Sequence, residues 1–316
     1  MIQLLQKMNQ KPYSSLISQH SKRTKALFAV GLVSFLWGTT WLASRFGVKF
    51  VPGLQLAAIR QTIAGLAIIF FFLLKGTKWP RGIEWITIFV LGFLNFFLSN
   101  GLTTWGVQYI SAGLGAIIAA IFPLWLVILG PFAGTSKFPA GKAVIGLLLG
   151  FGGVCVVFYD HLVDFFKADF RFGIFVSLVA TLSWALGTIY TKQRSQEFNP
   201  YFSIGLQMFV SGITLYLVSS FAGIAIPIQQ IPWQSWAAIG YLVVFGSVVS
   251  FLAYLYALQN LPTEQVSIYA YINPVVAVLL GSFLFGERLS IFIAVGGIIT
   301  LYGVYLVNEV FRKIDP

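Results

Sequence analysis

Residues 112–129, AGLGAIIAAIFPLWLVIL, run from Ala112 to Leu129 without a charged side chain. An apolar stretch of about 20 residues is long enough to cross the hydrocarbon core of a bilayer as an α-helix. The stretch is continuously apolar and does not alternate with polar residues, which favours a helix over a strand of a membrane barrel. This segment therefore predicts a transmembrane helix.

The composition of the chain extends this prediction to most of its 316 residues. Hydrophobic residues make up 58% and charged residues 9% of the chain, and the mean hydropathy is +0.86. A soluble domain carries about 25% charged residues, so a water-soluble fold of this size is excluded. About ten transmembrane helices are expected, over Ala26–Ser44, Pro52–Leu74, Trp85–Thr104, Ala112–Leu129, Lys142–Phe158, Phe172–Tyr190, Tyr201–Ala222, Trp236–Leu258, Thr263–Phe285 and Leu289–Val310.

The net charge of +11 is concentrated between these spans, which indicates a membrane surface and a topology signal and not nucleic acid. If the N-terminal tail is placed inside, the inner loops and C-terminal tail receive Lys75, Lys78, Arg81, Lys137, Lys142, Lys192, Arg194, Arg312 and Lys313. The outer loops then receive only Arg45, Lys49, Lys167, Arg171 and Arg288. Because basic residues favour the cytoplasmic side, we expect a plasma-membrane protein with both termini in the cytoplasm.

The chain repeats itself. Residues 105–109, WGVQY, align with residues 256–260, YALQN, and at the same offset Pro123 falls on Pro274. Each half holds an odd number of spans, so the second half is inverted relative to the first, as in many secondary transporters. We expect an all-α integral membrane protein of two inverted five-helix repeats around a central cavity. Its parts are a cytoplasmic tail (1–25), the first repeat (26–159), an extracytoplasmic linker (160–171), the second repeat (172–311) and a second cytoplasmic tail (312–316).

Short motifs appear in order along both halves. They are LWGTTW at 36–41 followed by Arg60, YISA at 109–112, YINPVV at 271–276 and GERL at 286–289. Together they resemble the EamA family of the drug/metabolite transporter superfamily over nearly all of residues 26–310. The first half departs from this pattern, with Thr135-Ser136 where the second half has Gly286-Glu287. The resemblance implies ten helices around a cavity and export or exchange of small metabolites by alternating access, with amino acids a common substrate class.

Carboxylates and histidines lie outside the predicted spans or at their ends. The carboxylates are Glu84, Asp160, Asp164, Asp169, Glu197, Glu264, Glu287, Glu309 and Asp315, and the histidines are His20 and His161. Proton-coupled carriers commonly hold such a group inside the membrane, where burial shifts its pKa into a useful range. This distribution favours a facilitator, or coupling through a carboxylate at a loop edge such as Glu264 or Glu287.

Arg60 is the one permanent charge near the middle of a predicted span. An intramembrane arginine costs a few kcal/mol on insertion scales unless it finds partners or water. One interpretation is that its guanidinium binds a substrate carboxylate with two hydrogen bonds. The other is that it caps carbonyls or joins two helices. Both interpretations stay open at the level of sequence.

Further candidates for the substrate site are polar or aromatic residues within the spans. Asn273 offers a donor and an acceptor, and Asn95 is favoured over Asn100 because it lies deeper in its span. Trp37, Thr40, Trp184 and Tyr271 lie in the family motifs or aligned with them, and aromatic rings can stack on solutes. Pro123 and Pro274 should free the carbonyls of Ala119 and Ala270 and act as hinges or gates, although a kink that only shapes packing is the alternative.

Other classes of protein find little support in the sequence. A membrane enzyme would need an acid/base pair, a nucleophile or a metal cluster, and the one cluster, His161 with Asp160 and Asp164, matches no known motif. Cys155 is the single cysteine, and a nucleotide-binding loop is absent. We therefore expect no catalytic residue, metal or cofactor. The expected partners are a small-molecule substrate and the lipid bilayer, a homodimer is left open, and the alternative is an enzyme or scaffold without transport activity.

Overall fold

The computed structural model describes residues 13–134, 141–159, 162–194, 199–261, 266, 269–287 and 289–314. In this part of the chain every regular element is helical. Eight helical segments are long and apolar enough to cross a membrane, and Tyr269–Phe285 and Ile291–Val307 are shorter apolar helices. The predicted all-α membrane fold is confirmed. Residues Asp160, His161 and Glu264 and the pair at 135–136 lie outside the described residues.

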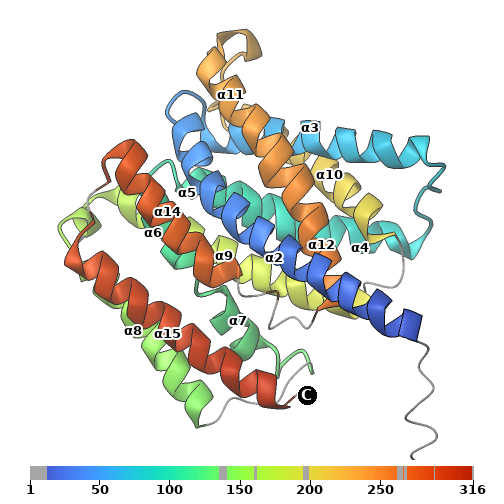
Figure 1. The fold of residues 1–316 in the computed structure, drawn as a ribbon. Helices are drawn as coiled ribbons and strands as arrows, with labels where there is room; N and C mark the ends of the chain where they lie inside the picture. Colours follow the sequence, from blue (N-terminus) through green and yellow to red (C-terminus); the bar gives the residue numbers. More distant parts are fainter. Residues whose placement is uncertain are drawn as a thin grey trace, which may run out of the picture.

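The first half of the chain contains five helical segments that are long and apolar enough to cross a membrane, and Figure 1 shows how they are arranged. They are α2 (Tyr13–Gly47), α3 (Gly53–Leu74), the run of α4 (Ile83–Leu91), η1 (Gly92–Gly101) and α5 (Leu102–Gly106), then α6 (Ala112–Ala119) with α7 (Phe122–Leu129), and α8 (Lys142–Tyr159).

The second half repeats this order. After the short turn η2 (Asp164–Phe166) come α9 (Ala168–Arg194), α10 (Pro200–Phe221), the turn η3 (Ile228–Gln230), the run of α11 (Trp233–Tyr241), η4 (Leu242–Val249) and α12 (Ser250–Asn260), then α14 (Tyr269–Phe285) and α15 (Ile291–Ile314).

Three helices extend at least four residues beyond their predicted ends. Helix α2 begins at Tyr13, inside the predicted N-terminal tail, because residues 13–25 contain neither proline nor glycine to break it. Helix α9 begins at Ala168 instead of Phe172, and α15 continues through residues 312–314. Charged residues end a hydrophobic span but do not end a helix, so the apolar pattern underestimates helix length.

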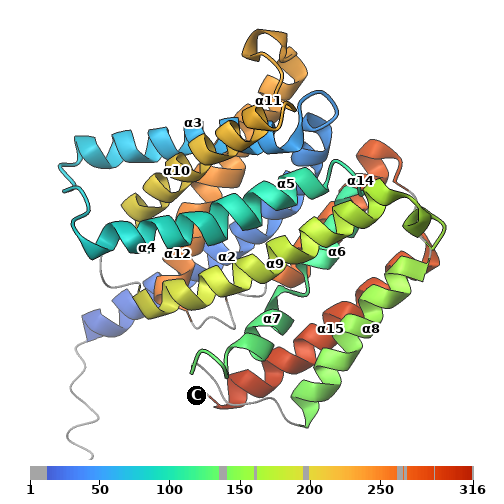
Figure 2. The same ribbon diagram turned by 180° about the vertical axis from the view of Figure 1, so that it is seen from behind.

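The two halves pack through matching helices. Helix α3 lies along α10, and α8 lies along α15, and both pairs are seen side by side in Figures 1 and 2. The first helix of each half packs on elements of the other half, α2 on η4, α12 and α14, and α9 on η1, α5, α6 and α7. This reciprocal exchange is the arrangement that two repeats related by a two-fold axis produce.

Glycines allow the paired helices to touch backbone to backbone. A Cβ added to Gly65 would lie 2.5 Å from the backbone nitrogen of Phe209, and one added to Gly212 would lie 2.6 Å from that of Thr62. Residues 62 and 65 thus face 212 and 209, so the order is antiparallel, as inverted repeats require.

The pair α8–α15 shows the same reciprocity. Added Cβ atoms at Gly146 and Gly153 would each lie 2.6 Å from a carbonyl oxygen of α15, that of Gly303 and that of Gly296. These glycines therefore join the two halves of one chain and do not face a second copy.

The third crossing segment of each half contains a π-helical stretch, η1 and η4, at overlapping positions of the internal alignment. A π-helix adds a residue to each turn and leaves carbonyl oxygens for other donors. Ser183 of the second half donates to the carbonyl of Leu94 at 2.9 Å, and Trp37 of the first half donates to that of Gly246 at 3.2 Å. Each half thus stabilises the irregular segment of the other.

The two aligned prolines have different effects. At Pro123 the helix is interrupted, with α6 ending at Ala119 and α7 beginning at Phe122. Pro274 lies inside the continuous helix α14. The two prolines therefore occupy aligned positions in the sequence, but the backbone around them differs.

A leucine at Gly153 should destabilise the protein, because any side chain there meets the backbone of α15. Overpacking of a close contact costs about 1–3 kcal/mol. We expect Gly153→Leu to lower the thermal unfolding temperature of the purified protein. The matched control is Gly152→Leu, since a Cβ on that neighbouring glycine meets no atom within 4 Å. Equal unfolding temperatures for the two variants would contradict the described helix contact.

Candidate functional site

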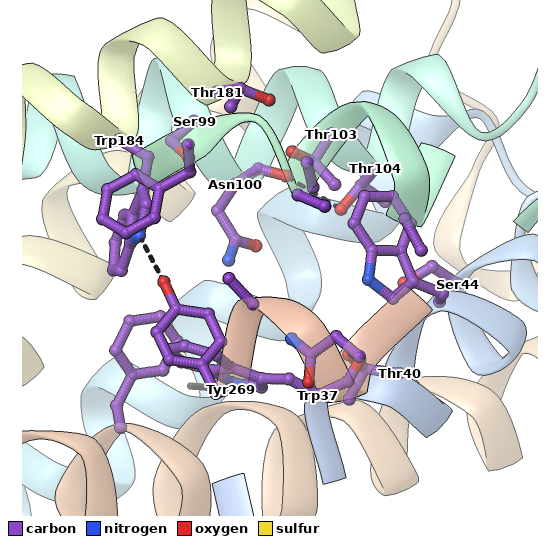
Figure 3. Close-up of a pocket in the computed structure, with 18 of the residues that line it drawn as sticks. Trp37, Thr40, Ser44, Ser99, Asn100, Thr103, Thr104, Thr181, Trp184 and Tyr269 are labelled. Carbon is purple, nitrogen blue, oxygen red and sulfur yellow. Dashed lines mark hydrogen bonds between the residues drawn. The ribbon is translucent and has the colours of Figure 1, made fainter. Parts of the chain in front are cut away.

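A central cavity of about 140 Å³ lies between the two halves, and we call it the Arg60 cavity. Its walls come from both halves, from α2, α3, η1, α5, α6, α7, α9, α12 and α14 (Figure 3). Its polar residues include Thr40, Arg60, Ser99, Asn100, Thr103 and Asn273. Its aromatic residues are Trp37, Trp41, Phe122, Trp184, Phe251 and Tyr269.

Arg60 is 5% exposed and lies in the wall of this cavity. Its Nε donates to the hydroxyl of Ser247 at 2.9 Å. Within the described part of the chain, its terminal nitrogens Nη1 and Nη2 make no hydrogen bond, and no carboxylate pairs with the guanidinium. A guanidinium carries five N–H donors, so most of the donors of Arg60 have no partner among the described residues.

Gly246 makes room for this arginine. A Cβ added to Gly246 would lie 3.1 Å from Nη2 of Arg60 and 2.8 Å from the methyl carbon of Thr40. The guanidinium thus packs directly on the backbone of the π-helical segment η4. Ser247, the next residue, supplies its hydrogen-bond acceptor. Both contacts of Arg60 are with neutral groups.

A run of polar residues on η1 and α5 lines the same cavity as Arg60. Ser99, Asn100, Thr103 and Thr104 all line it, and Figure 3 shows the Asn100 side chain pointing into it. The Asn100 Oδ1 is buried and has no hydrogen-bond partner. An amide oxygen without a partner in a low-dielectric site is costly, so this oxygen is available to a ligand donor.

Asn273 ties α14 to α2 in the wall of the Arg60 cavity. It is 8% exposed, and its amide nitrogen, oriented toward two carbonyls, donates to that of Ser34 at 2.5 Å and that of Tyr269 at 3.1 Å. Ala119 and Ala270, whose carbonyls the prolines release, line the same cavity.

A second cavity, of about 420 Å³, lies toward the opposite end of the helices. Its lining includes Glu84, Asn95, Thr188, Thr191, Arg194 and Gln207, and we call it the Gln207 cavity. Gln207 is the eighth residue of α10 as Arg60 is the eighth of α3, so the two cavities carry matched positions of the two repeats. Their chemistry differs there, with an amide in place of a permanent cation.

Five aromatic side chains separate the two cavities, and we call them the aromatic septum. They are Trp37, Trp184, Phe251, Tyr254 and Tyr269. The Trp37 ring has its centroid 5.0 to 6.0 Å from those of the other four. Trp184 and Phe251 line both cavities. The Trp184 Nε1 donates to the Tyr269 hydroxyl at 3.0 Å, a bond drawn in Figure 3.

The predicted site residues do not all line the same cavity. The Arg60 cavity brings together Trp37, Thr40, Arg60, Trp184 and Asn273. Asn95 lines only the Gln207 cavity, and its Oδ1 is buried without a hydrogen-bond partner.

Tyr271 lines neither cavity and packs against the core cluster formed by α6, α7, α8, α9 and α15. Two helical positions separate residues by about 200° around the axis, so Tyr269 is the tyrosine that faces the Arg60 cavity. The sequence pattern indicated Tyr271 instead of Tyr269 and favoured Asn95 over Asn100. The polar run SNGLTT at 99–104, inside an apolar span, is the signal that indicates this wall.

Glu287 has a structural partner. Its Oε1 accepts from the backbone N–H of Ala112 at 3.0 Å and its Oε2 from that of Gly113 at 3.3 Å, at the start of α6. A carboxylate at a helix N-terminus satisfies free N–H groups and complements the helix dipole. Glu287 lines neither cavity. The described residues also contain no group of three or more potential metal ligands.

Comparisons with known proteins agree with this architecture. The chain matches the EamA-like transporter family over residues 24–159 and again over 171–309. It is 30% identical over 267 residues to YedA of Escherichia coli (strain K12), named an uncharacterized inner membrane transporter, covering 84% of this chain and 83% of that one. It is 26% identical to the transporter YvbV of Bacillus subtilis (strain 168), over 90% and 92% of the two chains.

A crystal structure that is 17% identical has the same fold, with a TM-score of 0.66 over 93% of this chain and 100% of that chain. Two matches to one family, which together span most of the sequence, account for the duplicated architecture. This multi-pass membrane protein belongs to the EamA-like transporter family.

Proposed function

We propose that this protein is a secondary transporter that moves small metabolites across the plasma membrane by alternating access. The observation that carries the proposal is the pair of cavities that meet at one aromatic septum. A carrier needs a site that opens to one side at a time. Rotation of one repeat against the other around this septum would open one cavity and close the other.

The substrate binds in the Arg60 cavity, with Arg60 as its main polar contact. The unpaired Nη1 and Nη2 groups suit a carboxylate, which a guanidinium binds with two parallel hydrogen bonds. This arrangement supports the ligand interpretation of Arg60 over the purely structural one, since only the bond to Ser247 joins it to another helix. Amino acids and related carboxylates are the first solutes to examine.

The transporter is a facilitator or exporter, and none of the described carboxylates couples it to protons. Glu287 is engaged with the start of α6, and among the described carboxylates only Glu84, in the first turn of α4, lines either cavity. The distribution of basic residues among the loops favours a cytoplasmic location for both termini. The repeats, residues 26–159 and 172–311, move as the two units, with flexing at Pro123 and Pro274.

A membrane enzyme or a scaffold is the alternative. An enzyme needs a nucleophile, an acid/base pair or a metal near the bound substrate. The Arg60 cavity offers hydroxyls, amides and one guanidinium, without a described carboxylate, histidine or cysteine in its walls. A scaffold would have no use for two cavities lined by polar groups.

Efflux from reconstituted liposomes tests the transport proposal. Liposomes that contain the protein and are preloaded with a panel of amino acids and other small carboxylates should release one solute class faster than preloaded liposomes without protein. Trp37→Ala and Asn273→Ala should each slow this release at least tenfold, because the first removes the centre of the septum and the second the tie between α14 and α2. Release of no solute by folded, inserted protein would contradict transport of this class.

A matched pair of tyrosine variants tests the location of the site. Tyr269→Phe removes the acceptor for Trp184 but keeps the ring, and we expect a several-fold change in the Michaelis constant for efflux. Tyr271→Phe makes the same chemical change outside both cavities and should leave the Michaelis constant unchanged. The reverse ranking would argue for a different substrate site.

Removing the charge of Glu287 should lower the stability of the protein and leave the pH dependence of substrate flux unchanged. Glu287→Gln keeps an acceptor for α6 but loses the charge, so we expect a loss of about 1 kcal/mol in unfolding free energy. The dependence of substrate flux on an imposed pH gradient should match that of the unmodified protein. A pH response present in the unmodified protein and absent in the variant would assign coupling to Glu287.

A further inference from the structure

The Arg60 cavity has a charge balance that narrows the class of substrate. We infer that it selects organic monoanions, solutes with one carboxylate, an apolar or aromatic body and no ammonium group, over zwitterionic amino acids. This inference rests on the proposed function, because it concerns the solute that the same cavity carries.

The first step is the charge of the cavity walls. Arg60 is the one charged residue among those that line the cavity in the described part of the chain. None of the described carboxylates lines this cavity, and Glu287 faces the start of α6. The empty cavity therefore carries a net charge of about +1 with no internal counterion.

The second step is the effect of each ligand on that charge. A monoanion bound to Nη1 and Nη2 neutralises the cavity, so the occluded complex buries an ion pair with no net charge. A zwitterion leaves the net charge at +1 and adds a second cation near the guanidinium. Because Coulomb interactions are strong in a low-dielectric interior, the ammonium is repelled by Arg60 without an acidic partner to offset it.

The third step is the supply of hydrogen-bond acceptors. An ammonium group has three N–H donors to satisfy. The Asn100 Oδ1 is a buried amide oxygen of this cavity without a hydrogen-bond partner. The hydroxyls of Thr40 and Thr104 donate to backbone carbonyls of their own helices and keep lone pairs that can accept. These acceptors are neutral, so they can receive hydrogen bonds from an ammonium but cannot offset its charge as a carboxylate would.

The fourth step is the body of the solute. Six aromatic side chains surround the cavity, three of them tryptophans, and they provide apolar surface on which a flat or aliphatic body can pack. The site therefore offers one cationic anchor, neutral acceptors and an apolar enclosure. A small aromatic or branched carboxylate satisfies the first and the third, and a hydroxyl on it can donate to the acceptors.

The charge balance also affects the energetics of transport. A monoanion that crosses the membrane alone carries one negative charge, so a potential negative inside drives it outward. A potential of about 59 mV raises the outside-to-inside ratio at equilibrium about tenfold for one charge. Export of a neutral zwitterion shows no such dependence.

Three ligands that differ only in their charged groups test the inference. They are 3-phenylpropanoate, phenylalanine and 2-phenylethylamine, titrated into the purified full-length protein near pH 7 and followed by quenching of tryptophan fluorescence. We expect 3-phenylpropanoate to bind at least tenfold more tightly than phenylalanine, and 2-phenylethylamine to bind most weakly. Arg60→Gln should abolish the preference, and Arg60→Lys, which keeps the charge, should retain part of it.

A second variant adds the missing acid and does not depend on the folding of an Arg60 variant. Asn100→Asp places a carboxylate of the same shape in the cavity, and we expect it to reverse the ranking in favour of phenylalanine. Binding of phenylalanine to the unmodified protein as tightly as 3-phenylpropanoate would overturn the inference, as would no binding of any of the three ligands. An unchanged ranking in folded Asn100→Asp would also overturn it.

Liposome measurements separate this inference from the proposed function. Selective binding of the monoanion without any flux would contradict transport and leave the charge selection intact. Flux of phenylalanine that exceeds that of 3-phenylpropanoate and ignores an imposed potential would support transport and overturn the charge selection.

Discussion

Backbone contact between matching helices of the two halves is the constraint on which the rest of the structure depends. Without side chains at Gly65, Gly212, Gly146 and Gly303, the pairs α3–α10 and α8–α15 could not approach as closely as they do. In a membrane, where apolar side chains gain little by leaving lipid, such close packing provides much of the association energy between helices. These two helix pairs hold the two halves together on either side, and the helices between them surround the cavities.

Between these helix pairs, several polar groups are satisfied across the repeat boundary. Trp37 and Ser183 each donate to a carbonyl of the π-helical segment in the opposite half, and Ser247 accepts from Arg60. Asn100 Oδ1 and the terminal nitrogens of Arg60 remain unpaired in the wall of the Arg60 cavity, and Asn95 Oδ1 remains unpaired in that of the Gln207 cavity. Unpaired polar groups are costly in a membrane interior, so a polar ligand that pairs with those of the Arg60 cavity would stabilise the occupied site.

The sequence predicted the class of fold and the duplication because both follow from composition and from matched motifs. Arg60 was recognised because a charge in an apolar span is rare. The rotation of a helix about its axis is set by packing, so sequence could not decide between Tyr269 and Tyr271. The π-helical segments were not predicted either, because their composition is as apolar as that of any other span. The interruption at Pro123 was not predicted because the aligned Pro274 lies within a continuous helix, so a proline alone does not decide whether the helix breaks. The Gln207 cavity carries an uncharged amide at the position of Arg60, which gave no comparable signal.

Alternating access requires that the two cavities open to opposite sides of the membrane and that the aromatic septum keeps them from being open together. The most direct test uses single cysteines at Thr103, in the Arg60 cavity, and Thr191, in the Gln207 cavity, after replacement of Cys155 by serine. A membrane-impermeant thiol reagent would be applied from one face at a time to protein of known orientation. The account predicts that each cysteine reacts from one face only, the two from opposite faces, and that a transported solute raises the reactivity of one while lowering that of the other. Reaction of both cysteines from the same face, or solute effects in the same direction at both positions, would contradict it.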